Sequence, residues 1–142
     1  MRSALRNVLA VVLGLLLGSA VNMALITLGP LLIPPPDGVD LNDTERFAEN
    51  LLRLQPVHFV MPWLAHALGT LAGALLAARL AASHHLACAL LVGVVFMAGG
   101  TLMVMRYGGP TWFIAMDLLG AYLPMAFWGG KLARRKTLPN AK

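Results

Sequence analysis

Four long apolar segments constrain the fold of this chain more than any other feature of its sequence. They cover residues 8–28, 57–82, 86–106 and 111–130. About 20 helical residues cross the hydrocarbon core of a bilayer, and backbone groups in lipid are satisfied only within helices or closed barrels. None of the segments alternates apolar and polar residues as a barrel strand does. The sequence therefore predicts an all-α, polytopic membrane protein, a single four-transmembrane-helix bundle spanning residues 1–142.

The composition supports a membrane protein. Hydrophobic residues make up 58% of the chain and charged residues 12%, about half the charged share of an average soluble domain. A core of this size cannot bury so much apolar surface, because small domains leave much of their surface exposed. The single cysteine, Cys88, excludes an internal disulfide and paired-cysteine chemistry. We therefore expect the lipid bilayer to cover the apolar surface.

The first segment has an alternative interpretation as a cleaved signal peptide. Arg2 and Arg6 precede an apolar run that reaches Gly18, Ser19 and Ala20. The run continues for more than a helical turn past these small residues, which is too long for the apolar region of a signal peptide. We therefore predict a retained transmembrane helix.

The positive charges predict the orientation. Most of them lie at the N-terminus, between the second and third segments, or after the fourth: Arg2, Arg6, Arg79, Lys131, Arg134, Arg135, Lys136 and Lys142. Only Arg46, Arg53 and Arg106 fall on the other side. The positive-inside rule then places both termini, including the tail 131–142, in the cytoplasm of a multi-pass protein, which we expect in the bacterial inner membrane. The same distribution accounts for most of the basic balance, so no nucleic-acid partner is expected.

The outer loop, residues 29–56, is the one sizeable piece outside the predicted bilayer. It holds five of the six acidic residues: Asp37, Asp40, Asp43, Glu45 and Glu49. The stretch 42–55 predicts a short amphipathic helix, with Asn42 as its N-cap and Glu45 completing a capping box. Its apolar face consists of Phe47, Leu51 and Leu54. Two interpretations stay open, a helix lying on the membrane surface and a lid over the bundle.

Polar residues inside the apolar segments are the candidate functional residues. They are Asn22, His66, Thr70, Thr101 and Asp117. Helical spacing puts small residues on the same helix faces as Asn22, His66 and Asp117, which is typical of close helix packing in membranes. The candidate packing residues are Gly14, Gly18, Gly69, Gly73 and Gly120.

The depths of these polar residues predict a cluster. With a rise of 1.5 Å per residue, Asn22 and Asp117 lie about 9 Å below the outer helix ends, Thr101 about 8 Å and His66 about 13 Å. An ionised aspartate at mid-membrane costs about 2.5–3.5 kcal/mol, which partners such as His66 and Asn22 would offset. Asp117 either has a functional role or holds helices together through hydrogen bonds.

Several chemistries are disfavoured by the residues present. The two histidines of the apolar segments, His58 and His66, share one predicted helix and cannot ligate a haem from opposite sides. The chain has no HExxH motif and no lysine within the apolar segments. We expect neither a cofactor nor a metal, and no catalytic constellation that would make an enzyme. Small multidrug exporters have a similar size and number of helices. They carry their essential acid in the first helix, whereas this chain has no acid in its first apolar segment and has Asp117 in its fourth.

The chain resembles a group of small bacterial four-helix membrane proteins that have no established activity. The resemblance is carried by 33-IPPPDGVD-40, 57-VHFVMPWLAHALGTLAGA-74 and 111-TWFIAMDLLGAYLPMAFWGGKL-132, and it covers nearly the whole chain. It implies the four-helix architecture and the choice of candidate residues. It implies no catalytic role, since none of these motifs is a catalytic signature.

Two functions of different classes follow. The first is a non-enzymatic accessory or scaffolding bundle with an outward-facing polar cluster, whose partner is a second copy or another membrane protein. The second is a small transporter or proton-coupled permeation or binding protein that uses Asp117 and His66. We place the accessory role first, because the polar cluster does not extend to the cytoplasmic side.

Overall fold

The computed structural model describes residues 2–133, which are all-helical apart from turns and loops and contain no strand. The elements in chain order are α1 (Arg2–Leu32), α2 (Phe47–Arg53), η1 (Pro56–Phe59), α3 (Val60–Leu80), α4 (His85–Tyr107), α5 (Thr111–Gly120) and α6 (Leu123–Leu132). Residues 134–142, most of the predicted cytoplasmic tail, lie outside the described residues.

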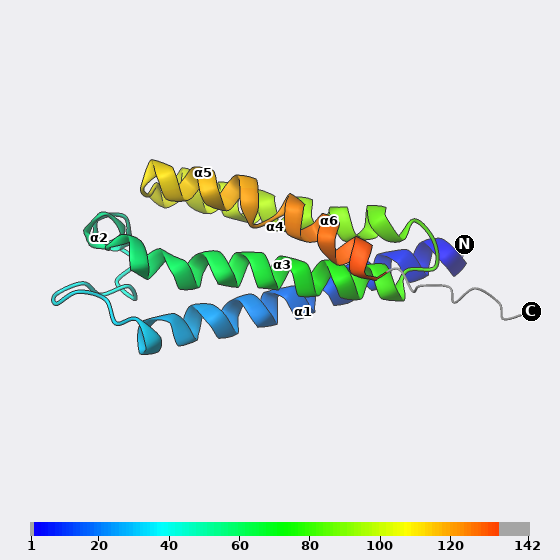
Figure 1. Cartoon of the computed structure of the whole chain (residues 1–142), viewed down its shortest axis with the longest axis horizontal. Coiled ribbons are helices and arrows are strands. Elements are labelled where there is room, and N and C mark those ends of the chain that lie inside the picture. The colour runs from blue at the N-terminus through cyan, green and yellow to red at the C-terminus, as the bar shows by residue number, and fades with distance from the viewer. Residues whose placement is uncertain (1, 134–142) are drawn as a thin grey trace, which may run out of the picture.

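Four helical stretches in this part of the chain are long and apolar enough to cross a membrane, by length and composition. They are α1, η1 with α3, α4, and α5 with α6. The all-α class and the four apolar helices of the prediction are therefore confirmed. Figure 1 shows α1 beside α3, and α4 beside α5 and α6, with α2 at the far end of the bundle from the N-terminus. We call these the α2 end and the N-terminal end.

The helix in the loop is shorter than predicted. It begins at Phe47, and the predicted N-cap at Asn42 is wrong, because the preceding residues form turns. The Asp43 side chain accepts hydrogen bonds from the backbone N–H groups of Glu45 and Arg46 at 3.1 and 3.2 Å. The Asp40 side chain accepts another from Asn42 at 2.8 Å. Such local side-chain bonds compete with helical backbone bonds, so the helix starts only after them.

The fourth apolar segment is interrupted, whereas the sequence predicts one continuous helix. Helix α5 ends at Gly120 and α6 begins at Leu123. Pro124 explains the interruption, because its ring cannot donate to the carbonyl of Gly120 and clashes with it. The interruption turns Tyr122 into the interior of the bundle, where its side chain is buried.

Helices α1 and α3 approach each other through glycines. A Cβ atom at Gly73 would lie 2.5 Å from the carbonyl oxygen of Gly14, and one at Gly69 would lie 2.8 Å from that of Gly18. Any larger residue would push the two backbones apart. Gly120 differs, because a Cβ atom there would meet the Trp63 ring no closer than 3.7 Å, an ordinary contact. The structure therefore places four of the five predicted packing glycines at a close helix contact.

The tightest core lies toward the N-terminal end and is built mainly from alanine. Its members come from α1, α3, the turn after α3, α4 and α6: Ala10, Val11, Ala74, Ala77, Ala78, Ala81, Cys88, Ala89, Val92 and Ala126. Toward the α2 end, the pair α1 and α3 separates from the pair α4 and α5 (Figure 1). The helices therefore pack closely at one end and diverge at the other.

Candidate binding cavity

A cavity of about 970 Å³ lies between the diverging helices at the α2 end. One face of α1 and one face of α4 flank it, and α3 and α5 contribute His66, Thr70 and Asp117 to its wall. Most of the remaining wall consists of apolar side chains and glycines. Pockets of roughly 300–1,000 Å³ hold small molecules in proteins, usually with a few polar groups in an apolar wall. The cavity has the size and the lining of a small-molecule site.

Asp117 is the centre of a hydrogen-bonded cluster in this wall. Its carboxylate is buried, at 4% exposed, and its two oxygens lie 2.8 and 2.9 Å from Nδ1 of His66. The hydroxyl of Tyr122 donates to Oδ2 at 3.0 Å. The rings of His66 and Tyr122 are stacked, with centroids 5.6 Å apart. The side chains of His66 from α3, Asp117 from α5 and Tyr122 from the α5–α6 junction are thus joined by hydrogen bonds.

The cluster leaves one nitrogen of His66 free. When Asp117 is ionised, its carboxylate can only accept hydrogen bonds, so Nδ1 of His66 donates to it and Nε2 keeps its lone pair. Nε2 has no hydrogen-bond partner among residues 2–133. The His66 side chain is 26% exposed and lines the cavity. His66 is therefore the member of the cluster that a molecule in the cavity can reach.

The elements around the cluster hold it in place. The glycine contact between α1 and α3 fixes the helix that carries His66. On the opposite side, Gly100 of α4 lies directly against the Tyr122 hydroxyl, so that a Cβ atom at this position would overlap it. Residues from four separate helical segments thus set the position of one carboxylate.

The other candidate residues, Asn22, Thr70 and Thr101, make no hydrogen bond to this cluster. Asn22 is half-buried and lines the cavity, without a hydrogen bond to His66 or Asp117. Thr70 also lines the cavity, is fully buried, and its hydroxyl has no partner in the described residues. The structure does not bring Thr101 to the cluster. Its side chain is exposed, and its hydroxyl donates to the Met97 carbonyl of its own helix at 2.8 Å.

The position of Thr101 follows from helical phase. Depth along the axis places Thr101 near the cluster, but each residue also turns the helix by about a quarter of a circle. Gly100 faces Tyr122, so its neighbour Thr101 points away. The residue that sequence reasoning missed is Tyr122. The available signal was Pro124, which predicts an interrupted helix nearby.

Helix α2 closes the cavity from the loop side. Its apolar residues Phe47 and Leu51, together with Leu54, line the cavity, and the Phe47 ring packs edge-on against Tyr107 with centroids 5.0 Å apart. The loop is fixed from within, since the buried Asn50 side chain donates to the Asp40 carbonyl at 2.7 Å. Helix α2 therefore contacts the bundle through its apolar face, as the lid interpretation requires.

The cavity is open along one side, between α1 and α4. Several residues in its wall are also exposed on the outer surface, among them Met23 of α1 at 64% and Met103 of α4 at 52%. Deeper in the bundle the opening ends at Phe96, whose ring would meet any side chain placed at Gly18. The opening is thus bordered by apolar helix surface.

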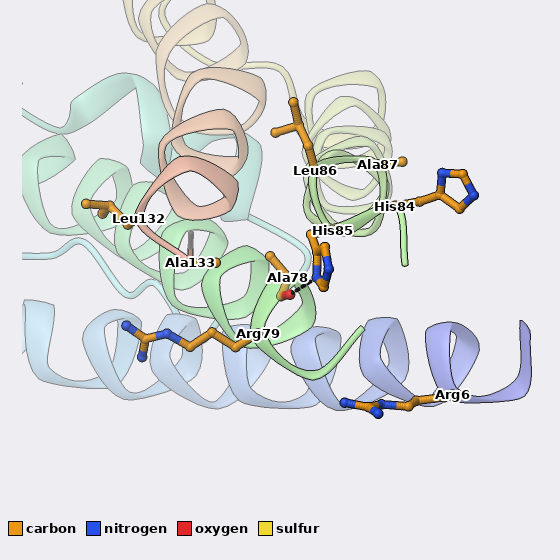
Figure 2. Close-up of a pocket in the computed structure, with 9 residues that line it drawn as sticks. All are labelled: Arg6, Ala78, Arg79, His84, His85, Leu86, Ala87, Leu132 and Ala133. Carbon is orange, nitrogen blue, oxygen red and sulfur yellow. Dashed lines mark hydrogen bonds between the residues drawn. The ribbon is translucent and has the colours of Figure 1, made fainter. Parts of the chain in front are cut away.

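A second hollow, of about 1220 Å³, lies at the N-terminal end. Figure 2 shows that the basic side chains of Arg6, Arg79 and His84 lie apart from one another, with no common centre. The His85 ring is bonded to the Ala78 carbonyl at 2.8 Å. This hollow lacks converging groups, so the cavity at the α2 end is the candidate site.

Comparison of the chain with protein families, curated proteins and solved structures finds no match. Within residues 2–133, no group of three or more His, Cys, Asp or Glu side chains is arranged to hold a metal ion. The functional inference therefore rests on the geometry of the cavity and its polar cluster.

Proposed function

We propose that this chain is an integral membrane protein that binds a small amphiphilic molecule in the cavity at the α2 end. The observation that carries the proposal is the position of the His66–Asp117 pair. It is the one contact between a basic side chain and a carboxylate within ion-pair distance in the described residues, and it lies in the wall of an otherwise mostly apolar cavity. An ionisable pair among membrane helices marks a functional site by default, because its insertion is costly.

The exposed surface supports the membrane location. Long apolar side chains cover the outer face of α1, including Leu5, Leu9, Leu13 and Leu16, and lipid is the medium that suits such a surface. The basic residues of the N-terminal end support a cytoplasmic position for that end. The cavity then lies in the outer half of the bilayer, and the resemblance noted above supports a bacterial inner membrane.

The side opening supports an amphiphile as the ligand. In a bilayer, the border formed by Met23 and Met103 faces hydrocarbon, so the apolar part of a ligand enters from the lipid. Its polar part meets Nε2 of His66, whereas α2 separates it from water. Methionine side chains adapt to ligands of varied shape, which suits such an entrance.

The packing favours this binding role over the accessory role. The small-residue faces that motivated a scaffolding function are used inside the chain, where Gly14 and Gly18 contact Gly73 and Gly69. They are therefore not available to a partner helix. No serine, threonine or cysteine is bonded to His66 within residues 2–133, so the proposal is one of binding and not of catalysis.

Photolabelling of a cavity-filling variant tests the proposal. Gly99 lines the cavity, and a Cβ atom there would meet no atom within 4 Å, so Gly99→Phe adds a side chain at the cavity wall without a backbone clash at its Cβ atom. The probe is an alkyl alcohol with a photoreactive diazirine, in phosphatidylcholine vesicles. We expect labelling of cavity residues in the unmodified protein and a reduction of about tenfold in Gly99→Phe, which corresponds to about 1.4 kcal/mol of binding free energy.

The matched control is Ala98→Phe, one residue away on the exposed surface of α4 and outside the cavity wall. It adds the same side chain and should leave the labelling unchanged. Equal labelling of cavity residues in both variants would contradict the proposal. So would labelling confined to the outer face of α1.

A further inference from the structure

We infer that the cavity selects a lipophilic ammonium, an organic cation with an N–H group and an apolar body, and that this cation competes with a proton for Nε2 of His66. The inference rests on the proposed function and specifies its ligand. It is carried by the charge of the cavity wall, by the free nitrogen of His66 and by the aromatic rings around it.

The charge of the wall is negative. Asp117 is the one carboxylate in it, and no lysine or arginine of the described chain lines the cavity. The basic residues of this end point elsewhere: Arg53 donates to the Gly38 carbonyl at 2.9 Å, and Arg106 lies over the Tyr107 ring, 5.2 Å from its centroid. The loop above the cavity holds five of the six acidic residues of the chain. In a medium of low dielectric, a single uncompensated carboxylate attracts a cation strongly.

The free nitrogen determines which cation fits. The oxygens of Asp117 are buried and already accept hydrogen bonds from His66 and Tyr122, so a ligand does not reach them directly. With Nδ1 protonated, Nε2 of His66 is a pure acceptor and requires a donor. An ammonium N–H donates to Nε2, while the Nδ1–H of the same ring donates to the carboxylate. The imidazole thus transmits the attraction of Asp117 to the ligand without any proton being transferred.

Aromatic rings in the wall favour a cation further. Besides Tyr107, whose ring already has Arg106 over it, the cavity is lined by Phe47, Phe59, Phe96, Phe113 and Tyr122. The faces of such rings carry partial negative charge and attract cations within about 6 Å of the ring centre. A neutral alcohol gains only the hydrogen bond to Nε2, whereas an ammonium gains the attraction of the carboxylate and of the rings as well.

Protonation of His66 removes both the free acceptor at Nε2 and the negative charge of the wall. A proton on Nε2 takes the place of the lone pair, and the resulting imidazolium neutralises the charge of Asp117. The other titratable groups in the wall are Asp117 of α5, Tyr122 of the α5–α6 junction, Tyr107 of α4 and His58 of η1, and α1 presents none. His58 has both nitrogens engaged, with Gln55 and with the Pro34 carbonyl. Ammonium binding should therefore weaken as the pH falls through the protonation of His66.

Three photoreactive probes that differ only in the head group test this inference. They carry the same diazirine-bearing alkyl chain and end in a primary ammonium, a hydroxyl or a carboxylate. Cavity labelling is measured by mass spectrometry in phosphatidylcholine vesicles, relative to labelling of the outer face of α1, which reports the probe concentration in the lipid. While Nε2 of His66 is unprotonated and the amine probe is charged, we expect the ammonium probe to bind about tenfold more tightly than the alcohol, the usual advantage of a charged hydrogen bond.

Lowering the pH far enough to protonate His66 should remove this preference in the unmodified protein. In His66→Gln the remaining preference should not vary with pH, and in Asp117→Asn it should be lost at every pH. The comparison of head groups on the unmodified protein needs no variant, so the test does not depend on the folding of either one.

The outcomes separate the two proposals. Equal binding of all three probes, abolished by Gly99→Phe, would overturn the ammonium inference and leave the binding function intact. A preference for the carboxylate probe would also overturn it, since it would mean that His66 is protonated in the resting state. Absence of cavity labelling with every probe would overturn both.

Discussion

The two ends of the bundle are built from the same long helices but pack differently. Toward the N-terminal end, alanine and glycine allow close contact, and the core contains no charged side chain among its members. At the α2 end, the helices carry aromatic and methionine side chains on their facing sides and diverge around a cavity. Small side chains reduce the distance between helices, whereas large ones increase it. The comparison shows that residue size along each helix decides where the bundle is solid and where it is hollow.

The comparison also explains why the polar cluster sits at one end only. Asp117 needs hydrogen-bond donors at short range, which His66 and Tyr122 provide where the helices diverge. At the closed end, the polar contacts gather around the turn after α3, where for example Oδ1 of Asn7 accepts from the Ala82 N–H at 2.8 Å. The closed end packs closely through small side chains, and the open end holds the buried carboxylate.

The largest expected effect comes from disturbing the closed contact. In Gly73→Val, the new side chain would overlap the carbonyl of Gly14, so that α1 and α3 must separate. We expect a loss of about 3 kcal/mol in the free energy of unfolding, the upper part of the range for overpacking. Unfolding by titration with a denaturing detergent in mixed micelles measures it. Gly99→Val, which faces open space, is the control and should change stability by no more than about 0.5 kcal/mol; equal losses would refute the comparison.

An intermediate effect is expected from the polar cluster. Asp117→Leu leaves Nδ1 of His66 and the hydroxyl of Tyr122 without their acceptor, which should cost about 1–3 kcal/mol. Tyr122→Phe removes one hydrogen bond and should cost about 0.6 kcal/mol, a typical value among membrane helices. The same unfolding titration compares the two. If Tyr122→Phe were the more damaging change, the carboxylate would not be the centre of the cluster.

The smallest effect on global stability is expected in the lid. Asn50→Ala removes the hydrogen bond to the Asp40 carbonyl, which holds α2 against the preceding loop. We expect amide hydrogen exchange to become several-fold faster in residues 40–53, while α1 and α3 keep their protection, because local opening does not involve the closed core. Faster exchange throughout α3 would show instead that the lid and the bundle unfold together.

Much of the fold could be predicted from the sequence, because length, hydropathy and charge act locally. The second and third apolar segments were predicted close to their observed ends, whereas α1 begins six residues before and ends four residues after the predicted segment 8–28. The loop acids and the amphipathic face of residues 47–54 are also visible in the sequence. Helical spacing also identified Gly14, Gly18, Gly69 and Gly73, which lie at the α1–α3 contact. Each of these features belongs to a single segment of the chain, so predicting it requires no knowledge of the neighbouring helices.

The site could be predicted only in part, because it depends on how helices face each other. His66 was the expected partner of Asp117, but the same reasoning by depth included Thr101, which points away. It also missed Tyr122, which reaches Asp117 only because the helix is interrupted before Pro124. The sequence by itself determined which helices form and which residues are too polar for lipid. Only the tertiary structure decided which of those residues meet, because rotation about each helix axis and the spacing between helices result from side-chain packing across the whole bundle.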